Sequence, residues 1–322
     1  MGGVAGPDLA AAVSDAGGLG VVGCAGAEPG WIADCGERVR ALTQRPFGFN
    51  FILDGVETDD DREFVRAEVR AAAGAGARVV VLFWGDPVPY VDVAHADDVL
   101  VAVQIGSVDE ARAVVRAGVD IVIAQGIEAG GHVRGTTSVW ELLPETVRAV
   151  SPVPVVASGG IGDGAGLARA LSLGAQGVSL GTRFVATDEA RAHPGYKQRV
   201  VEATAADTVY CTLFDIGWPD APHRVIRNRV VDDWEAAGRP PPGSRPGEGT
   251  VIGKVTMSSG VRVDWPLYGV GSYSPDSDAD PELVPLWAGE SSEVVNDVKP
   301  AAAVVRELVL DASAVTTGRN GT

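Results

Sequence analysis

Three glycine-rich segments each follow a short apolar run, and one of them carries a histidine. Residues 125–132 read Gln-Gly-Ile-Glu-Ala-Gly-Gly-His, residues 157–163 read Ala-Ser-Gly-Gly-Ile-Gly-Asp, and residues 179–182 read Ser-Leu-Gly-Thr. Glycine has no Cβ atom, so adjacent glycines allow the backbone to lie close to a flat ligand. We therefore expect these segments to form a ligand site.

His132 is the residue of these segments that is best suited to acid–base chemistry. The sequence has only four histidines, and this one follows Gly-Gly after an apolar run. An imidazole with an ordinary pKa near about 6.5 can donate or accept a proton at neutral pH. We predict that His132 is catalytic; the alternative is a structural or surface histidine.

The other two segments predict a phosphate site. In α/β barrels the loops after the last two strands hold phosphate with backbone N–H groups and a helix N-terminus. Gly160 and the run Ser179, Leu180, Gly181 and Thr182 would occupy those loops. The alternative is a pair of tight turns without a ligand. Patterns for a Rossmann site, a P-loop or a G-x-S-x-G nucleophile are absent from the sequence.

Three amide side chains, those of Asn50, Gln104 and Gln125, lie within or at the end of apolar runs. A buried amide without a hydrogen-bond partner costs about 1–3 kcal/mol. We expect the edge of a bound cofactor to supply partners for all three. The alternative for each is a core amide that is satisfied within the protein.

The elements that must position these residues alternate regularly over residues 1–190. Runs rich in Val and Ile predict strands at 19–23, 47–53, 78–84, 98–104, 119–125, 153–157 and 177–180. Amphipathic spacing predicts helices at 7–16, 31–42, 60–73, 108–117, 139–150 and 164–173. Continuous apolar strands are typical of parallel sheets covered on both faces, so the pattern predicts an α/β fold, a (β/α)₈ TIM barrel.

A closed barrel of this type needs eight strands, and seven are predicted. The missing strand would precede the helix at 7–16, so we expect the first strand to be truncated. Either the true start lies further upstream, or residues 1–6 are the stub of that strand. An open, doubly wound sheet of seven strands is the alternative fold.

The alternation ends after about residue 190. Residues 239–249 include Pro-Pro-Pro and cannot continue a helix or a central strand, so we predict an exposed loop there. We assign residues 1–190 and 293–314 to the barrel, with a last helix at 301–310 whose apolar residues pack on it. Residues 191–292 are predicted to form a cap over one barrel face.

Four aromatic residues of the predicted cap are candidates for the wall of an apolar pocket over the ligand. They are Trp218, Trp265, Tyr268 and Trp287. The alternative is ordinary packing within a segment rich in loops.

The amino-acid composition disfavours some classes of binding partner. The formal charge of −17 and the isoelectric point near 4.6 disfavour nucleic acid and anionic membranes. The sequence shows no membrane-spanning run and no signal peptide, so we expect a cytoplasmic protein. Cys24, Cys35 and Cys211 have no CxxC spacing, which predicts neither a disulfide framework nor a metal site.

Several strings of this sequence resemble the nitronate monooxygenases, formerly called 2-nitropropane dioxygenases. They lie at residues 8–20, 46–50, 125–132, 158–163 and 180–184, and the resemblance covers nearly the whole chain. The resemblance implies a TIM barrel that binds FMN, with His132 at the position of the family's catalytic histidine. It implies FMN contacts from Asn50, Gln125, Gly130, Gly160 and Ser179 through Thr182, with Met1, Gly2 and Gly3 beside the isoalloxazine.

The sequence departs from the family pattern in two places. In this family the first strand normally ends in Pro-Met-Gly, and here the chain opens at that Met. The proline-rich stretch at 240–242 is also longer than the family pattern leads us to expect.

The resemblance implies oxidation of alkyl nitronates, and by extension nitroalkanes, by O₂ to a carbonyl compound and nitrite. The expected partners are this small substrate and O₂, and the expected state is a monomer or homodimer. FMN-dependent enoyl-acyl-carrier-protein reductases and NAD(P)H:quinone reductases share the same strings, so a flavin reductase is the first alternative. A non-catalytic barrel that binds a phosphorylated ligand is the second.

Overall fold

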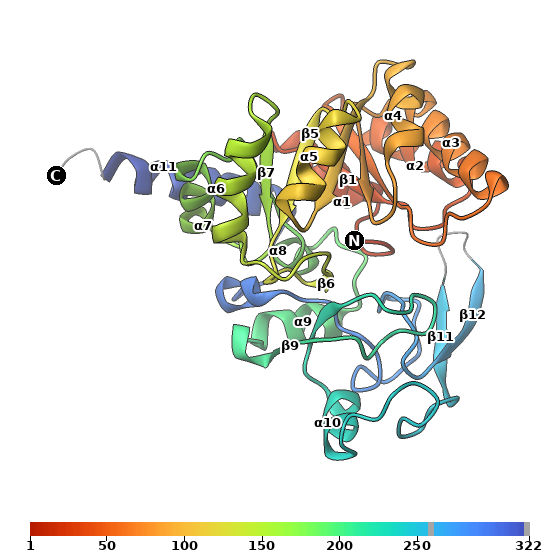
Figure 1. Ribbon diagram of the computed structural model, residues 1–322. Helices are drawn as coiled ribbons and strands as arrows, with labels where there is room; N and C mark the ends of the chain where they lie inside the picture. Colours follow the sequence, from red (N-terminus) through yellow and green to blue (C-terminus); the bar gives the residue numbers. More distant parts are fainter. Residues whose placement is uncertain (257–260, 319–322) are drawn as a thin grey trace.

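The computed structural model describes residues 1–256 and 261–318 and contains one large parallel sheet covered by helices (Figure 1). Its seven strands follow the order of the chain: β1 (Gly20–Gly23), β2 (Phe47–Ile52), β3 (Val79–Phe83), β4 (Leu100–Ile105), β5 (Ile121–Gln125), β7 (Val155–Ser158) and β8 (Gly177–Ser179). All neighbouring pairs are parallel. The predicted barrel architecture is confirmed, with all seven predicted strands present.

Eight helices accompany these strands in the described part of the chain: the first precedes β1, the last follows β8, and the six between them connect consecutive strands, as expected for βα units. They are α1 (Pro7–Asp15), α2 (Pro29–Leu42), α3 (Asp59–Gly74), α4 (Val88–His95), α5 (Val108–Arg116), α6 (Val139–Val150), α7 (Gly164–Ser172) and α8 (Thr182–Val185). The sequence patterns did not predict α4, because Pro87 and Pro89 at its start suggest a loop. In the structure the prolines lie at the start of the helix, where a missing N–H is tolerated.

The first and last strands, β1 and β8, form the edges of the sheet. Among the described residues no strand lies between them; residues 1–6 lie at this edge instead. The N–H of Gly23 donates to the carbonyl of Ala5 at 2.9 Å. A Cβ atom at Gly181 would lie 3.5 Å from Sδ of Met1. Thus the first residues of the chain contact the ends of both edge strands.

The inner face of the sheet is apolar toward the amino ends of the strands and polar at their carboxyl ends. Val79, Val81, Ala102 and Ile123 pack together inside the sheet. Strand register and the alternation of side chains place five polar residues on this same face near the carboxyl ends. They are Asn50, Gln104, Gln125, Ser158 and Ser179. The sequence therefore builds an apolar interior with a polar rim, which is the active face of such barrels.

A second group of elements lies below the barrel in Figure 1, and the N-terminus lies between the two. It contains α9 (Pro194–Glu202), η1 (Ala205–Asp207), β9 (Thr208–Cys211), β10 (His223–Ile226), α10 (Arg229–Ala236), β11 (Val251–Thr256), β12 (Arg262–Pro266) and η2 (Glu290–Val294). We call the described part of residues 191–292 the cap. β6 (Gly131–His132), from the barrel, pairs with β10, so the loop that carries His132 is joined to the cap by a sheet.

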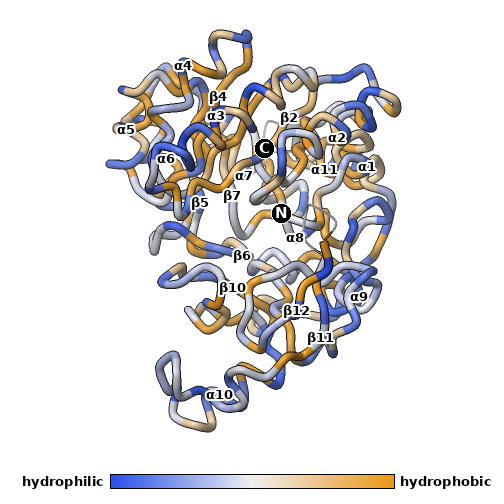
Figure 2. Tube along the Cα trace, turned by 90° about the vertical axis from the view of Figure 1, so that its right-hand side faces the viewer, coloured by the Kyte–Doolittle hydropathy of each residue, from blue (hydrophilic) through white to orange (hydrophobic). Residues whose placement is uncertain are grey.

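The last helix, α11 (Ala301–Gly318), returns to pack against α7 and α1. Val304, Val305 and Leu308 are buried there, as predicted, but Val309 is 55% exposed and does not join the packing. In Figure 2 hydrophobic residues are concentrated in the interior of the barrel, whereas outer turns of its helices are hydrophilic. No helix within the described ranges is long and apolar enough to span a membrane.

The proline-rich stretch at 239–249 forms turns without helix or strand, as predicted. The expectation that it is simply exposed is wrong for Arg245, which is buried. Its guanidinium donates to the carbonyl of Leu213 at 2.8 Å and pairs with the carboxylates of Asp215 and Glu248. A charge at this depth needs such partners, and they tie the stretch to the cap.

Candidate active site

His132 lies in a cluster of aromatic rings where the barrel meets the cap. Its ring stacks on Trp218, with centroids 3.8 Å apart, and lies 5.2 Å from the ring of Trp287. The rings of His223 and Trp84 approach it edge-on at 5.6 and 6.4 Å. We call these five residues the aromatic cluster.

The His132 imidazole is held in its neutral form. Burial, with a smaller contribution from neighbouring His223, lowers its pKa to about 3. Its Nε2 atom is buried and has no hydrogen-bond partner among the described residues. An unpaired buried polar atom costs about 1–3 kcal/mol, and a ligand atom would relieve that cost.

The side chain of Gln125 holds the backbone on which His132 lies. Its amide N–H donates to the carbonyl of His132, and its oxygen accepts from the N–H of Arg134, both at 2.9 Å. This geometry favours the alternative of an amide satisfied within the protein. A direct contact of Gln125 with a cofactor stays a prediction, and its role in orienting β6 was missed.

The two glycines before His132 differ in their surroundings. A Cβ atom at Gly130 would lie 2.3 Å from the backbone nitrogen of Gly289, so this glycine permits close packing of the cap on the loop. Gly131 has φ +71°, and no atom lies within 4 Å of the position that a Cβ would take there. The open glycine is therefore Gly131, whereas the space beside the predicted contact residue Gly130 is occupied by protein.

The loops after β7 and β8 present backbone donors that the protein leaves unpaired. Ser158 and Ser179 are paired in register, so the loops start side by side. Within the part of the chain that the structure describes, the N–H groups of residues 159, 160, 181 and 182 have no hydrogen-bond acceptor. Unpaired backbone N–H groups on neighbouring loops are a recurring means of holding phosphate.

Two side chains of these loops also make hydrogen bonds within the protein. The Thr182 hydroxyl accepts from the N–H of Gly289 at 3.0 Å. The Arg183 guanidinium is buried, donates to the carbonyl of Ala186 at 2.8 Å and pairs with Asp297 at 3.0 Å. The Thr182 hydroxyl accepts in its bond with Gly289 and keeps its O–H as a donor, and Arg183 Nε has no partner among the described residues.

The other predicted contact residues surround the same rim. Asn50 donates from its amide to the carbonyl of Val81 at 3.0 Å, which again favours partial satisfaction by the protein. The carbonyl of Gly2 accepts from the Ser272 hydroxyl, and a Cβ at Gly3 would lie 2.9 Å from Cβ of Ser272. Residues Met1 to Gly3 are thus fixed between barrel and cap.

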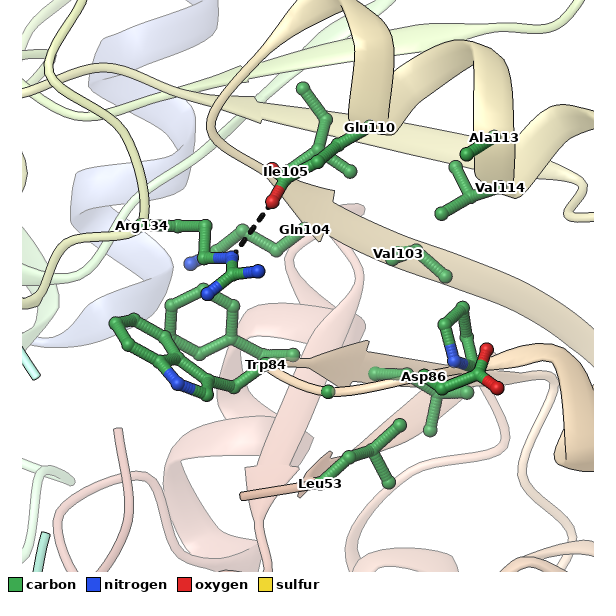
Figure 3. A pocket seen from close by; sticks show the side chains of 14 residues that line it. Leu53, Trp84, Asp86, Val103, Gln104, Ile105, Glu110, Ala113, Val114 and Arg134 are labelled. Atoms are coloured by element: carbon green, nitrogen blue, oxygen red, sulfur yellow. Dashed lines mark hydrogen bonds and ion pairs between the residues drawn. The ribbon is translucent and has the colours of Figure 1, made fainter. Parts of the chain in front are cut away.

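A cavity of about 310 Å³ lies next to the aromatic cluster (Figure 3). Trp84 and Gln104 line it, together with apolar residues of β3, β4 and α5. Arg134 lies over the Trp84 ring at 5.0 Å and pairs with Glu110 at 2.9 Å. Trp84 belongs both to the lining of this cavity and to the aromatic cluster, whereas His132 does not line the cavity.

The cap supplies two of the four aromatic residues expected at the site. Trp218 and Trp287 contact His132, but Trp265 and Tyr268 do not belong to the aromatic cluster. Trp265 donates to the carbonyl of Gly269 and Tyr268 to that of Pro246, so both serve the internal packing of the cap.

Sequence reasoning missed Trp84 and His223. Trp84 ends a predicted strand and has φ +62°, a strained conformation for a bulky residue that the sequence does not reveal. His223 lies in a strand of the cap that was not predicted. The small number of histidines was the one signal that could have drawn attention to it.

The sequence matches the protein family described as nitronate monooxygenase over residues 1–311. The chain belongs to this family. Among its relatives, a nitronate monooxygenase of Pseudomonas aeruginosa is 33% identical over 74% of this chain and 78% of its own length. The nitronate monooxygenase npaC of Metarhizium robertsii is 35% identical, with 72% of each chain covered.

Not every relative carries that name. A protein of Mycobacterium tuberculosis named (3aS,4S,5R,7aS)-5-hydroxy-7a-methyl-1-oxo-octahydro-1H-indene-4-carboxyl-CoA dehydrogenase is 37% identical over 74% of this chain. The match spans 64% of that dehydrogenase and 46% of another relative, a putative monooxygenase, so the chain spans less than two thirds of both. Membership of the nitronate monooxygenase family thus leaves the substrate open.

Solved structures agree with the fold over almost the whole chain. FabK of Thermotoga maritima superimposes with a TM-score of 0.76 at 29% identity, covering 100% of this chain and 94% of that one. A nitroalkane oxidase of Streptomyces ansochromogenes superimposes with a TM-score of 0.78 at 26% identity, covering 99% and 95%. Both the family and these structures identify the chain as an oxidoreductase with a TIM-barrel-like fold.

Proposed function

We propose that this protein is an FMN-dependent nitronate monooxygenase, which uses O₂ to convert alkyl nitronates to a carbonyl compound and nitrite. The observation that carries the proposal is the buried, unpartnered Nε2 of His132 in the aromatic cluster. It lies on the loop after β5, at the same rim as the unpaired N–H groups after β7 and β8. Family membership supports the same reaction.

The residues present fit FMN. The N–H groups of residues 159, 160, 181 and 182 would hold its phosphate, and the polar rim residues would lie along its ring. When bound, FMN supplies the electron chemistry, while the protein orients the substrate and sets the charge around it.

His132 binds and orients the substrate in this proposal. Because its ring is neutral, it can donate one N–H hydrogen bond to a nitronate oxygen without adding a positive charge to the pocket. For a neutral nitroalkane the same ring would have to accept the α-proton, and with a pKa of about 3 it is a weak base, so the site fits a nitronate better than a nitroalkane. The aromatic rings around it exclude water, which strengthens the hydrogen bond.

The cavity beside Trp84 gives room for the part of the substrate that does not react. Its lining is largely apolar, with the Arg134–Glu110 pair at one side. An alkyl substituent matches that chemistry better than a charged one does.

A flavin reductase that takes hydride from NAD(P)H is the second candidate. The likeness to FabK and to a relative named as a CoA dehydrogenase favours it. It would act on an enoyl thioester or a quinone.

One set of rate measurements separates the candidates. We expect oxygen consumption and nitrite release when the yellow holoenzyme receives propyl-2-nitronate. Under anaerobic conditions NAD(P)H should leave the flavin absorbance unchanged on the timescale of turnover. Rapid bleaching by NAD(P)H together with reduction of a quinone or an enoyl thioester would instead assign the protein as a reductase. Purification without flavin and without any of these activities would favour a barrel that only binds a phosphorylated ligand.

A further inference from the structure

His223 lies directly opposite His132 in the sheet that joins the barrel to the cap. The two residues are partners in the antiparallel pair β6–β10. Side chains of directly opposed residues lie on the same face and contact each other. Accordingly the two rings meet edge-on, with centroids 5.6 Å apart and planes inclined by 70°.

The hydrogen bonds of His223 fix its ring and its proton. Nε2 accepts from the backbone N–H of Phe214 at 3.2 Å, so Nε2 carries no proton. Nδ1 lies 2.9 Å from the carbonyl oxygen of Ala221, which can only accept, so Nδ1 carries the proton. The ring is fully buried, and a second proton would break the bond to Phe214. His223 is therefore neutral and cannot rotate freely.

The same ring supports a second member of the aromatic cluster. His223 meets the ring of Trp287 edge-on, with centroids 5.3 Å apart and planes inclined by 88°. His132 is enclosed by Trp218, Trp287 and His223, and no hydrogen bond links its Nε2 to the protein among the described residues. Packing, not a carboxylate or a carbonyl, thus sets the orientation of His132.

We propose that His223 is a positioning residue for His132: its ring, fixed by two hydrogen bonds, forms the wall that holds the His132 imidazole in place. This inference rests on the proposed catalytic role of His132. His223 does not itself exchange protons with the substrate, because both of its nitrogens are engaged.

Other titratable or charged groups near these rings come from several elements. The Cys211 thiol on β9 lies 3.5 Å from Nε2 of His223. Asp215 lies near His223 and is paired with Arg245. Arg134, which follows β6, lies over Trp84, and Asp54, which follows β2, lies beside Trp218. His223 is the member of this set that touches the His132 ring.

Two substitutions separate a positioning role from a merely structural one. His223→Gln offers an oxygen to the N–H of Phe214 but lacks a ring, whereas His223→Phe keeps a ring and loses both hydrogen bonds. Positioning by the ring predicts that His223→Gln is the more stable variant and the less active one. A purely structural role predicts that activity follows stability.

The experiment measures kcat, KM and the pH profile with propyl-2-nitronate, per bound flavin, together with the thermal midpoint of each holoenzyme. We expect kcat of His223→Gln to fall at least tenfold with KM within threefold, and its acid limb to move to higher pH. His223→Phe should stay within about fivefold of the wild-type kcat at a lower midpoint. Ile226→Ala, on the same strand but the opposite face, is a matched control that lowers stability and leaves kcat unchanged.

An unchanged kcat and pH profile in His223→Gln would overturn the inference, even if His223→Phe fails to fold. Activities that follow the thermal midpoints would overturn it as well. His132→Asn, measured in parallel, separates the two proposals. Wild-type turnover in that variant removes the catalytic role of His132, whereas loss of turnover there with an unaffected His223→Gln rejects only the positioning role.

Discussion

The loop after β5 and the loops after β7 and β8 lie next to each other at one rim of the barrel, but they are completed in different ways. In the first, the backbone is bound to distant segments: the N–H of Gly126 donates to the carbonyl of Ser158, and the carbonyl of Ile127 accepts from Arg224, both at 2.9 Å, although the N–H groups of Glu128 and Gly130 have no acceptor in the described part of the chain. In the other two, four N–H groups have no acceptor among the described residues.

This difference separates the two tasks of the site. A loop completed by protein contacts holds a side chain rigidly, which is what a group acting on a substrate requires. Loops with unpaired N–H groups can donate to the oxygen atoms of an anionic ligand, so we expect FMN to complete them. We therefore expect substitutions in the first loop to change rates and substitutions in the other two to change cofactor affinity.

The largest effect should follow from His132→Asn. We expect kcat/KM for a nitronate to fall roughly 100- to 1,000-fold, the range lost when one preorganised donor to an anionic oxygen is removed. Flavin content should be unchanged, because the phosphate donors lie on other loops. His193→Asn is the matched control: His193 caps α9 by accepting from the N–H of Gly195, and Asn can do the same. Wild-type turnover in His132→Asn would contradict the assignment of the loop after β5 to catalysis.

The next effect concerns a single backbone donor after β8. Thr182→Pro removes the N–H at the first position of α8, where proline fits a helix, whereas Thr182→Val keeps the N–H. Both lose the hydroxyl that accepts from Gly289, so that loss does not contribute to their difference, which combines the missing N–H with the constraint that proline puts on Gly181. A hydrogen bond to a charged group contributes about 1.5–3 kcal/mol, so FMN should bind roughly ten- to a hundredfold more weakly to the Pro variant.

Fluorescence titration of FMN into the apoproteins measures this difference. Equal dissociation constants for the Pro and Val variants would show that the N–H of residue 182 does not contact the phosphate.

The third prediction uses the pH dependence of activity to test how well the aromatic cluster excludes water from the His132 ring. Burial depresses the pKa of His132 from 6.5 to about 3, so the ring is neutral from about pH 4 upward and kcat/KM should be flat between about pH 5 and 8. Trp218→Leu removes the ring stacked on His132 and admits water, which moves this pKa back toward 6.5. Protonation on acidification would then lower activity at about pH 5 by up to about thirtyfold, the loss expected if the pKa returned fully to 6.5.

The pH–rate profiles of the two holoenzymes decide the point. An acid limb near about pH 6.5 already present in the wild type would contradict the sealed environment. Trp140→Leu, at a tryptophan that lies on Arg169 outside the cluster, controls for the loss of an indole.

The sequence predicted the parts of this site that depend on local patterns. Strand ends, glycine turns and a histidine after Gly-Gly are visible in the order of residues, and the seven strands and the site-bearing loops follow from them. Contacts that arise only when distant segments meet were not visible. His223 contacts His132 because two strands pair whose residues lie 91 positions apart in the sequence. Position 130 needs glycine because the backbone of Gly289 packs against it.

The partners of the predicted amides could not be inferred from the sequence for the same reason. Gln125 was recognised as a polar residue in an apolar run, but its acceptor and donor lie in and next to β6, whose pairing with the cap was not predicted. Periodicity identifies which face a residue occupies, whereas partners depend on how the elements pack.

The smallest expected effect is on stability, and it compares the two adjacent glycines of the loop after β5. Gly131→Ala has free space for a Cβ but keeps φ +71°, so we expect a loss of about 1 kcal/mol in the free energy of unfolding. Gly130→Ala would place a Cβ 2.3 Å from the backbone of Gly289, so it should be several times more destabilising because the cap must move away. Urea unfolding of both holoenzymes measures the two losses. Equal losses would show that the cap does not depend on close packing at Gly130, and the loop after β5 would then be no more tightly completed by protein than its neighbours.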